Sequence, residues 1–313
     1  MSWLDRQSFL GAQSERRLGE TTIGLAGCGG GNSHVAQQLA HAGVGRFVLV
    51  DDDLITLSNL NRLIGGTWID IQRGTAKVEV MRRMILAINP RARVKVYRSK
   101  WQLAGEALST CDVIVGGLDS VRSKDELDAF CRRLVIPYID QGMDVHHLGD
   151  TGGYLVAGQV VLSQPGSPCL RCLGIVTEGA LAEEARNYGA AGGRPQVVWP
   201  NGVLASLAVG LAVQLVAPWQ RRQRLGAYLS HDGNTGKVVE APRFMRQSEL
   251  VCSHYPPSAV GDMTFDIRKF RVAAADGKLR AKHWASRLFG LLRSRLLRRR
   301  QLSVRHRRAS DRR

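Results

Sequence analysis

The chain has 313 residues, of which 44% are apolar and 23% are charged, and its net charge is +17. This composition is typical of a soluble globular protein, and the length allows one large domain or two small ones. The N-terminus lacks a long apolar core, so no signal peptide is expected. We therefore expect a cytoplasmic protein whose six cysteines are reduced or bind a metal, which argues against a disulfide scaffold.

Short apolar runs alternate with helical patterns through the first half of the chain. Strands are predicted at residues 22–27, 46–51, 93–98, 112–117, 137–142 and 159–164. Helices are predicted at residues 33–43, 75–89 and 124–134. This alternation predicts an α/β fold, Rossmann-like and doubly wound, with a mostly parallel sheet. Its ligand crevice should lie at the carboxyl ends of the strands.

A glycine cluster follows the first predicted strand, in GLAGCGGGNSHVAQQLA at residues 24–40. Gly27, Gly29 and Gly30 permit a tight turn whose N–H groups can approach phosphate oxygens at the start of a helix. Asp51 ends the second strand and is suitably placed for a ribose hydroxyl. A glycine loop alone is a weak signal, and a plain turn is the alternative. Together these features predict a nucleotide without identifying it.

The residues after Asp51 favour a triphosphate. Arg62 can donate two hydrogen bonds to phosphate oxygens, and Lys77 can supply a point charge. Asp119 follows the predicted strand at 112–117 and is placed to hold a magnesium ion that bridges phosphates. Taken singly, the two cations could be surface charges and Asp119 a helix N-cap. Together they suit ATP attacked at its α-phosphate, with pyrophosphate leaving.

Eight short motifs extend this pattern in a fixed order. They are RQ (6–7), GCGG (27–30), AGVGRFVLVDDD (42–53), SNLNR (58–62), GTAK (74–77), INP (88–90), LDS (118–120) and PCLRC (168–172). As a set they resemble the ThiF/MoeB/HesA superfamily, and we place an adenylation domain of this type at residues 1–245. The resemblance implies binding of ATP and Mg²⁺. It also implies adenylation of the C-terminal carboxylate of a small ubiquitin-like or sulfur-carrier protein, often one ending in Gly-Gly.

The resemblance also implies roles for single residues. Gly30 would lie near the phosphates, Asp51 would bind the ribose and Asp119 the magnesium. The remaining ATP-binding positions are Gly27, Gly29, Asp53, Ser58, Asn59, Asn61, Arg62 and Lys77. In the family's dimers the early arginine reaches the partner's phosphates, so Arg6 is our candidate for that role and a homodimer is expected.

Three positions depart from the family's pattern. Asn32 replaces the third glycine of the loop, which tolerates a left-handed backbone but adds a side chain. Leu63 stands where glutamine commonly follows the arginine, and Lys124 replaces an arginine after the magnesium aspartate. Lysine keeps the charge with poorer geometry for two hydrogen bonds. We expect these changes to affect the rate more than the chemistry.

The cysteines raise the question of a metal. Cys169 and Cys172 form one C-x-x-C, and Cys252 with His254 could complete a tetrahedral Cys3His zinc site in the segment 246–273. A metal-free pair of turns is the alternative. No cysteine lies between Cys172 and Cys252, where ubiquitin-activating enzymes carry their catalytic thiol. We therefore predict that an external thiol, persulfide or amine attacks the acyl-adenylate directly.

Apolar and basic residues dominate the second half. The run at 202–216 contains Gln214 and is predicted as a late, buried helix instead of a membrane span. We place a basic helix and tail at 274–313, where residues 278–313 alone contribute +13 of the net charge. Five apolar residues recur there at helical spacing, namely Trp284, Leu288, Leu291, Leu292 and Leu296. A basic amphipathic helix of this kind suits nucleic acid, an anionic membrane or an acidic protein, or a solvated tail without a specific partner.

Three other functions compete with carrier adenylation. A tRNA-modifying dehydratase of the same superfamily is supported by the stretch at 119–137 and by the basic tail. A non-catalytic scaffold that binds a ubiquitin-like partner is supported by Asn32 and Lys124. A nicotinamide dehydrogenase fits least, because it does not explain SNLNR together with Lys77.

Overall fold

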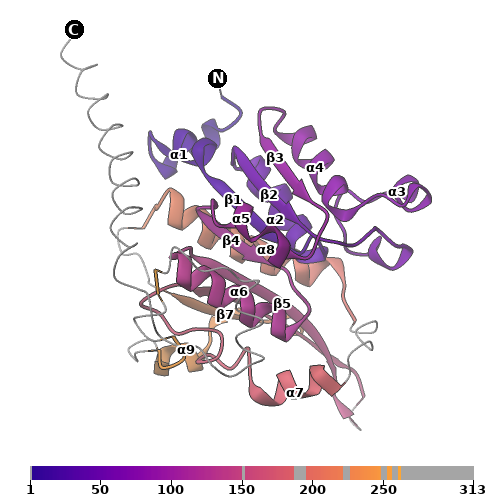
Figure 1. The fold of residues 1–313 in the computed structure, drawn as a ribbon, viewed down its shortest axis with the longest axis vertical. Coiled ribbons are helices and arrows are strands. Elements are labelled where there is room, and N and C mark those ends of the chain that lie inside the picture. Colours follow the sequence, from indigo (N-terminus) through magenta and orange to yellow (C-terminus); the bar gives the residue numbers. More distant parts are fainter. Residues whose placement is uncertain are drawn as a thin grey trace, which may run out of the picture. The chain divides into compact units, whose positions relative to one another are not determined.

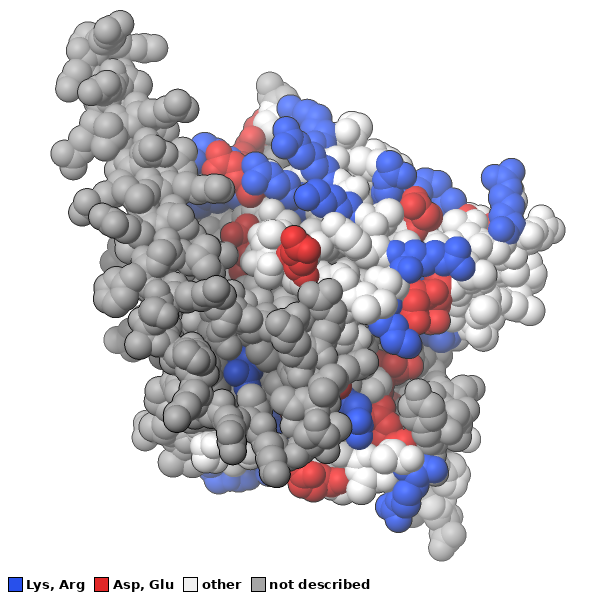
Figure 2. Space-filling model, in the orientation of Figure 1, with Lys and Arg blue, Asp and Glu red and all other residues white. Residues whose placement is uncertain are grey.

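A computed structural model describes residues 2–149, 152–186, 195–220, 226–247, 252–255 and 260–261 (Figure 1). Residues Met1–Gly261 cluster into one compact unit. The predicted basic helix and tail lie outside the described residues, as does most of the segment 246–273. On the face drawn in Figure 2, basic and acidic side chains of the described residues are interspersed. Most of the net charge of +17 comes from residues 278–313, which contribute +13.

The centre of the fold is an eight-stranded sheet in the order β3-β2-β1-β4-β5-β6-β7-β8. The strands are β1 (Thr22–Ala26), β2 (Arg46–Val50), β3 (Arg93–Tyr97), β4 (Val113–Gly116), β5 (Tyr138–His147), β6 (Tyr154–Ser163), β7 (Ala227–Asp232) and β8 (Lys237–Glu240). The first five strands in this order, β3, β2, β1, β4 and β5, are parallel to one another. Strands β6, β7 and β8 each pair antiparallel with the strand before them in the sheet. The predicted doubly wound, mostly parallel α/β sheet is confirmed.

Helices cover both faces of this sheet. They are α1 (Ser14–Glu20), α2 (Gly30–His41), α3 (Trp68–Arg73), α4 (Lys77–Ile88), α5 (Gly105–Leu108), α6 (Val121–Leu134), α7 (Glu178–Arg186), α8 (Val198–Val216) and α9 (Pro242–Gln247). Three 3₁₀ turns are η1 (Asp5–Leu10), η2 (Leu57–Asn59) and η3 (Trp101–Ala104). Side chains of α2, α4 and α8 share one apolar core with the sheet. Helix α6, which connects β4 to β5, packs against the opposite face (Figure 1).

The strand register positions the candidate site. Ala26 of β1 pairs with Val50 of β2 on one side and with Gly116 of β4 on the other. These strands are almost entirely buried, as apolar runs covered by helices on both faces should be. Their carboxyl ends consequently meet at one edge, where Gly27, Asp51 and Gly117 follow.

The antiparallel part of the sheet was only partly predicted. Strand β5 continues to His147 and β6 begins at Tyr154, beyond the expected ranges, while β7 and β8 were not expected at all. The added stretches are polar or half-exposed; β8, for example, has no buried residue. The added part of β5 and the strands β7 and β8 lack the continuous apolar runs by which the parallel strands are recognised, whereas the added part of β6 is apolar and was missed.

The late apolar helix, α8, begins at Val198, four residues before the predicted range. Among the described residues it is the one helix long and apolar enough to cross a membrane, judged by length and composition alone. Here it packs against α2, β5 and β6, and Leu204, Ala205 and Ala208 are buried in the core. The helix is therefore accommodated in the core of the fold, as the sequence predicted.

Candidate nucleotide and metal sites

The glycine loop has the geometry that a phosphate requires. Gly27 has φ = 83°, and its N–H donates to Val50 O at 2.9 Å. A Cβ at this position would lie 2.7 Å from Gly117 O, so only glycine fits. Gly29 is the N-cap of α2 without a side-chain cap, and the space beside its Cα is open. The first N–H groups of α2 are thus available to an anion.

Asp51, Asp53 and Lys77 are brought together beside this loop. The Asp51 carboxylate accepts hydrogen bonds from Cys28 N at 2.6 Å and from Asp53 N at 2.8 Å. Burial raises the pKa of Asp51, and nearby Lys77 partly offsets the effect. Lys77 Nζ lies 2.6 Å from Asp53 Oδ2. Each carboxylate oxygen retains a free lone pair, so a ribose hydroxyl could still donate to Asp51.

The SNLNR motif folds over the loop and brings Arg62 to it. A Cβ on Gly30 would lie 3.1 Å from Arg62 Cγ. The guanidinium donates to Ser58 O and, at 2.9 Å, to Asn61 Oδ1. Burial lowers the pKa of Arg62. Among the described residues the guanidinium forms no ion pair with a carboxylate, which leaves donors for a phosphate.

The other polar residues of the motif have structural partners. Asn59 is buried, and its Oδ1 accepts from Thr56 N at 3.0 Å, which closes the η2 turn. Asn61 Nδ2 donates to Gln196 O at 2.9 Å and so joins the motif to the start of α8. Ser58 Oγ lies 3.0 Å from Thr56 Oγ1. Contact of Ser58, Asn59 and Asn61 with ATP stays a prediction.

Asp119 lies directly after β4 at the same edge of the sheet. Its side chain is exposed, and among the described residues no hydrogen bond or ion pair to it is found. The alternative reading as a helix N-cap is wrong, because Ser120 caps α6 by accepting from Ser123 N at 3.1 Å. The carboxylate is consequently free for a cation.

Arg6 lies at the opposite end of α2 from the glycine loop. It is exposed in η1, which is tied to the end of α2 by a hydrogen bond from Gln7 Nε2 to Ala42 O at 2.9 Å. Its action on a partner's phosphates stays a prediction.

Asn32 has a structural explanation that the sequence did not provide. It lies in the first turn of α2 with an ordinary helical backbone, so left-handed tolerance is not used. Its fully buried Nδ2 donates to Gly27 O at 2.7 Å and to Ala26 O and Val115 O at 3.2 Å. Its Oδ1 accepts from Gln141 Nε2 at 2.7 Å. Asn32 therefore joins the ends of β1, β4 and β5 beneath the loop.

The other two departures are also explained by packing. Leu63 is buried in a small apolar cluster with Ile55 and Val80. Lys124 is buried too, and its Nζ lies 2.9 Å from Asp140 Oδ2 and 3.3 Å from Gln141 O. Its charge is thus neutralised inside the fold instead of facing the nucleotide loop.

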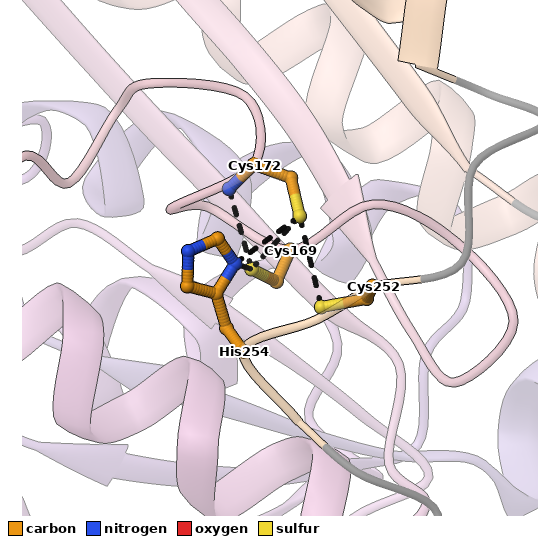
Figure 3. Close-up of side chains that lie close together, drawn as sticks. All are labelled: Cys169, Cys172, Cys252 and His254. Atoms are coloured by element: carbon orange, nitrogen blue, oxygen red, sulfur yellow. Dashed lines mark hydrogen bonds between the residues drawn. The ribbon is translucent and has the colours of Figure 1, made fainter.

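The four predicted metal ligands lie together (Figure 3). The Sγ atoms of Cys169 and Cys172 are 3.6 Å apart, and Cys172 Sγ lies 3.7 Å from Cys252 Sγ. His254 Nδ1 lies 3.5 Å from Cys169 Sγ and 3.3 Å from Cys172 Sγ. A tetrahedron with zinc–sulfur bonds of about 2.3 Å has sulfur–sulfur edges of about 3.8 Å. The residues therefore fit one tetrahedral zinc ion, with His254 bound through Nδ1.

The remaining cysteines are poor nucleophiles. Cys28, Cys111 and Cys131 are buried. Burial raises the pKa of Cys111 to about 12 and raises the pKa of Cys28 and Cys131 well above their usual value. They pack as small apolar residues in the interior of the fold.

Fold and site together define a doubly wound α/β protein whose candidate site lies at the carboxyl ends of β1, β2 and β4. The chain belongs to the ThiF family, whose profile matches residues 4–253. Over 198 residues it is 33% identical to the sulfur carrier protein ThiS adenylyltransferase of Escherichia coli, covering 62% of this chain and 72% of that protein. The family resemblance seen in the sequence is confirmed.

Two further relatives match over shorter lengths. The SAMP-activating enzyme E1 of Haloferax volcanii is 29% identical over 166 residues, or 52% of this chain and 57% of that protein. The tRNA threonylcarbamoyladenosine dehydratase of E. coli is 33% identical over 135 residues, which cover 42% of this chain and 50% of that protein. The chain thus spans about half the length of these two relatives.

Solved structures resemble the fold. E. coli MccB with succinimide matches at a TM-score of 0.64 and 20% identity, covering 81% of this chain and 74% of that chain. MccB with MccA-N7isoASN matches with the same TM-score at 21% identity. At this identity the likeness concerns the fold alone.

Proposed function

We propose that this protein uses ATP to adenylate the C-terminal carboxylate of a small ubiquitin-like or sulfur-carrier protein. A carboxylate oxygen of the carrier attacks the α-phosphorus, the bond from that phosphorus to the bridging oxygen breaks, and pyrophosphate leaves. An external thiol, persulfide or amine then attacks the acyl-adenylate and releases AMP. The whole reaction requires no thiol of the enzyme.

One observation carries this proposal. At a single sheet edge, the uncapped start of α2 lies beside Arg62, which has no carboxylate partner in the part of the chain that the structure describes, and an exposed aspartate follows the neighbouring strand β4. Arg62 and the α2 N–H groups would hold phosphate oxygens, while Asp51 would hold the ribose. Asp119 would hold Mg²⁺, which neutralises charge on the phosphates when bound.

Three further features belong to the proposal. Cys169, Cys172, Cys252 and His254 would hold a structural zinc ion that stabilises the fold. The protein would act in the cytoplasm as a homodimer, with Arg6 reaching the partner's triphosphate, and the carrier would end in Gly-Gly. The basic tail would supply a separate contact with nucleic acid, anionic membrane or an acidic protein.

The test is ATP–pyrophosphate exchange by the full-length protein. A ubiquitin-like carrier with a C-terminal Gly-Gly, taken from the same genome, should be required for exchange, because the carboxylate is the nucleophile. Deleting the two glycines should abolish it. The proposal would be overturned if exchange occurred without a carrier. It would also be overturned if no exchange occurred with any such carrier.

A second candidate is the tRNA dehydratase activity carried by one relative. It predicts AMP formation that depends on threonylcarbamoyladenosine-containing tRNA and not on a carrier protein. Parallel assays with the two substrates separate the candidates. A protein that binds carrier without exchange in either assay would instead be a scaffold.

A further inference from the structure

A fully buried ion pair on α6 lies next to the four metal ligands. Asp128 and Arg132 are one helical turn apart and are 1% and 2% exposed. Arg132 Nε lies 3.1 Å from Asp128 Oδ1, and Ser163 Oγ bridges the two side chains. Replacing such a pair by apolar residues often costs little stability, so its presence calls for another explanation.

The pair fixes the backbone on both sides of Cys169. Arg132 Nη2 donates to Ser167 O and to Pro168 O, each at 2.9 Å. Asp128 Oδ2 accepts from Leu170 N at 2.9 Å. The residues immediately before and after the first ligand are therefore held by one ion pair, which sets where the Cys169 Sγ points.

The same arginine also contacts the second half of the site. The guanidinium carbon of Arg132 lies 5.4 Å from the centroid of the Tyr255 ring, and Tyr255 directly follows His254. Cys169 and His254 are far apart in the sequence. The guanidinium thus touches the neighbours of ligands from both segments.

A second ion pair on α6 supports the C-x-x-C turn itself. Arg171, between the two cysteines, places Nε and Nη2 each 2.7 Å from a different oxygen of Asp125. Asp125, Asp128 and Arg132 recur at helical spacing, so one face of α6 holds the turn. The contacts are made from a rigid element instead of a loop.

We propose that the Asp128–Arg132 pair and the Tyr255 ring are positioning residues that pre-assemble the Cys3His metal site. This inference rests on the metal site proposed above. Groups that orient metal ligands typically contribute 10- to 100-fold to metal affinity. Because the pair also satisfies Ser167 O, Pro168 O and Leu170 N, its replacement should lower the free energy of unfolding too, so zinc affinity is the readout that separates positioning from folding.

The experiment measures zinc affinity of the full-length protein by competition with a chromogenic chelator. The double variant Asp128→Leu/Arg132→Met should bind zinc about 10- to 100-fold more weakly while its thermal transition stays cooperative. With Co²⁺, its charge-transfer band should still report three thiolates. Two variants of Tyr255 make a milder change. Tyr255→Leu removes the ring and should weaken zinc binding, whereas Tyr255→Phe keeps the ring and should not.

Arg83→Met is the control, because it removes an ion pair with Asp70 that lies far from the metal ligands in the sequence and on other elements. It should leave zinc affinity unchanged. Wild-type affinity in both the double variant and Tyr255→Leu would overturn the inference while leaving the metal site intact. A wild-type protein that binds no zinc would overturn the metal site and the inference with it. If the double variant does not fold, the zinc affinities of Tyr255→Leu and Tyr255→Phe test the inference instead.

Discussion

Polar side chains gather in two regions of this molecule, at the carboxyl ends of β1, β2 and β4 and along the face of α6 beside Cys169. At the strand ends, Asp119 is exposed, and the oxygens to which Arg62 donates within the described part of the chain are neutral. Along α6, Asp128 and Arg132 are buried, and each makes several hydrogen bonds. The residue types are the same in both regions, but their surroundings differ.

This contrast separates binding groups from framework groups. A charge without a partner persists only where water or a ligand can reach it, because burial without hydrogen bonds is costly. Arg62 and Asp119 meet that condition, which agrees with the proposal that they bind phosphate and magnesium. The α6 pair is already satisfied within the chain, so it can stabilise the arrangement of other residues but has no free group for a substrate.

The largest effect should follow from removing a charge at the strand ends. Arg62→Ala or Asp119→Ala should each reduce carrier-dependent ATP–pyrophosphate exchange by at least about 100-fold, because each stabilises charge that develops in the transition state. Arg82→Ala is the matched control, since Arg82 pairs with Glu79 on the surface of α4. Exchange that survives both alanine substitutions would place the site elsewhere.

The metal ligands should matter for stability more than for chemistry. Purified protein should contain about one zinc per chain. Cys172→Ser should lose the metal, and an ion present at about 1,000 times its Kd contributes about 4 kcal/mol to the free energy of unfolding. That loss corresponds to a fall in Tm of about 10 °C for a domain of this size.

Metal analysis and differential scanning calorimetry, on protein never exposed to chelators, check this expectation. Cys111→Ser, at a buried cysteine outside the ligand set, separates loss of metal from loss of a packed thiol. Metal-free wild-type protein would contradict the site, and a Cys172→Ser variant that keeps its zinc would contradict the ligand set.

The two regions also differ in how far they could be predicted. The glycine loop and Asp51 follow apolar strands directly and Asp119 follows within three residues, so strand order alone brings them to one edge. The C-x-x-C spacing likewise predicted half of the metal site. By contrast, the bond between Gln141 and Asn32 and the bonds from the α6 pair to residues 163–170 are long-range contacts between elements. The spacing of Asp128 and Arg132 is typical of a helical ion pair, but a single sequence carries no signal for the partners that either residue finds on other elements.

Asn32 shares features of both regions. It belongs to the glycine loop, like the strand-end residues, but its side-chain amide is hydrogen-bonded within the fold, like the α6 pair. Asn32→Gly restores the family's glycine yet removes hydrogen bonds to Ala26 O, Gly27 O and Val115 O and leaves Gln141 Nε2 unpaired. With the added cost of glycine in a helix, we expect a loss of about 2–4 kcal/mol.

Urea unfolding of the Asn32→Gly variant measures this loss. Gly19→Ala near the end of α1, where a Cβ meets nothing within 4 Å, is the comparison and should be as stable as the wild type or up to about 1 kcal/mol more stable. If the glycine variant were as stable as the wild type and faster in exchange, Asn32 would slow catalysis without stabilising the fold.

The smallest expected effect is the absence of a covalent intermediate. The thiols of Cys28, Cys111 and Cys131 are buried and their pKa values are raised, so thiolate is scarce at neutral pH. The other three cysteines lie in the metal cluster, where zinc would occupy them. Activated carrier should therefore stay bound as the adenylate until an external nucleophile attacks.

Non-reducing electrophoresis after incubation with ATP and carrier tests this mechanism. We expect no shifted enzyme band that dithiothreitol removes, and the Cys131→Ala variant should behave like the wild type in exchange. A dithiothreitol-sensitive band lost on substitution of one cysteine would identify a thioester at that residue. Because the candidate thiols are buried, such a band would also require the fold to open around them. Direct transfer from the adenylate needs no such opening, and for this reason we favour it.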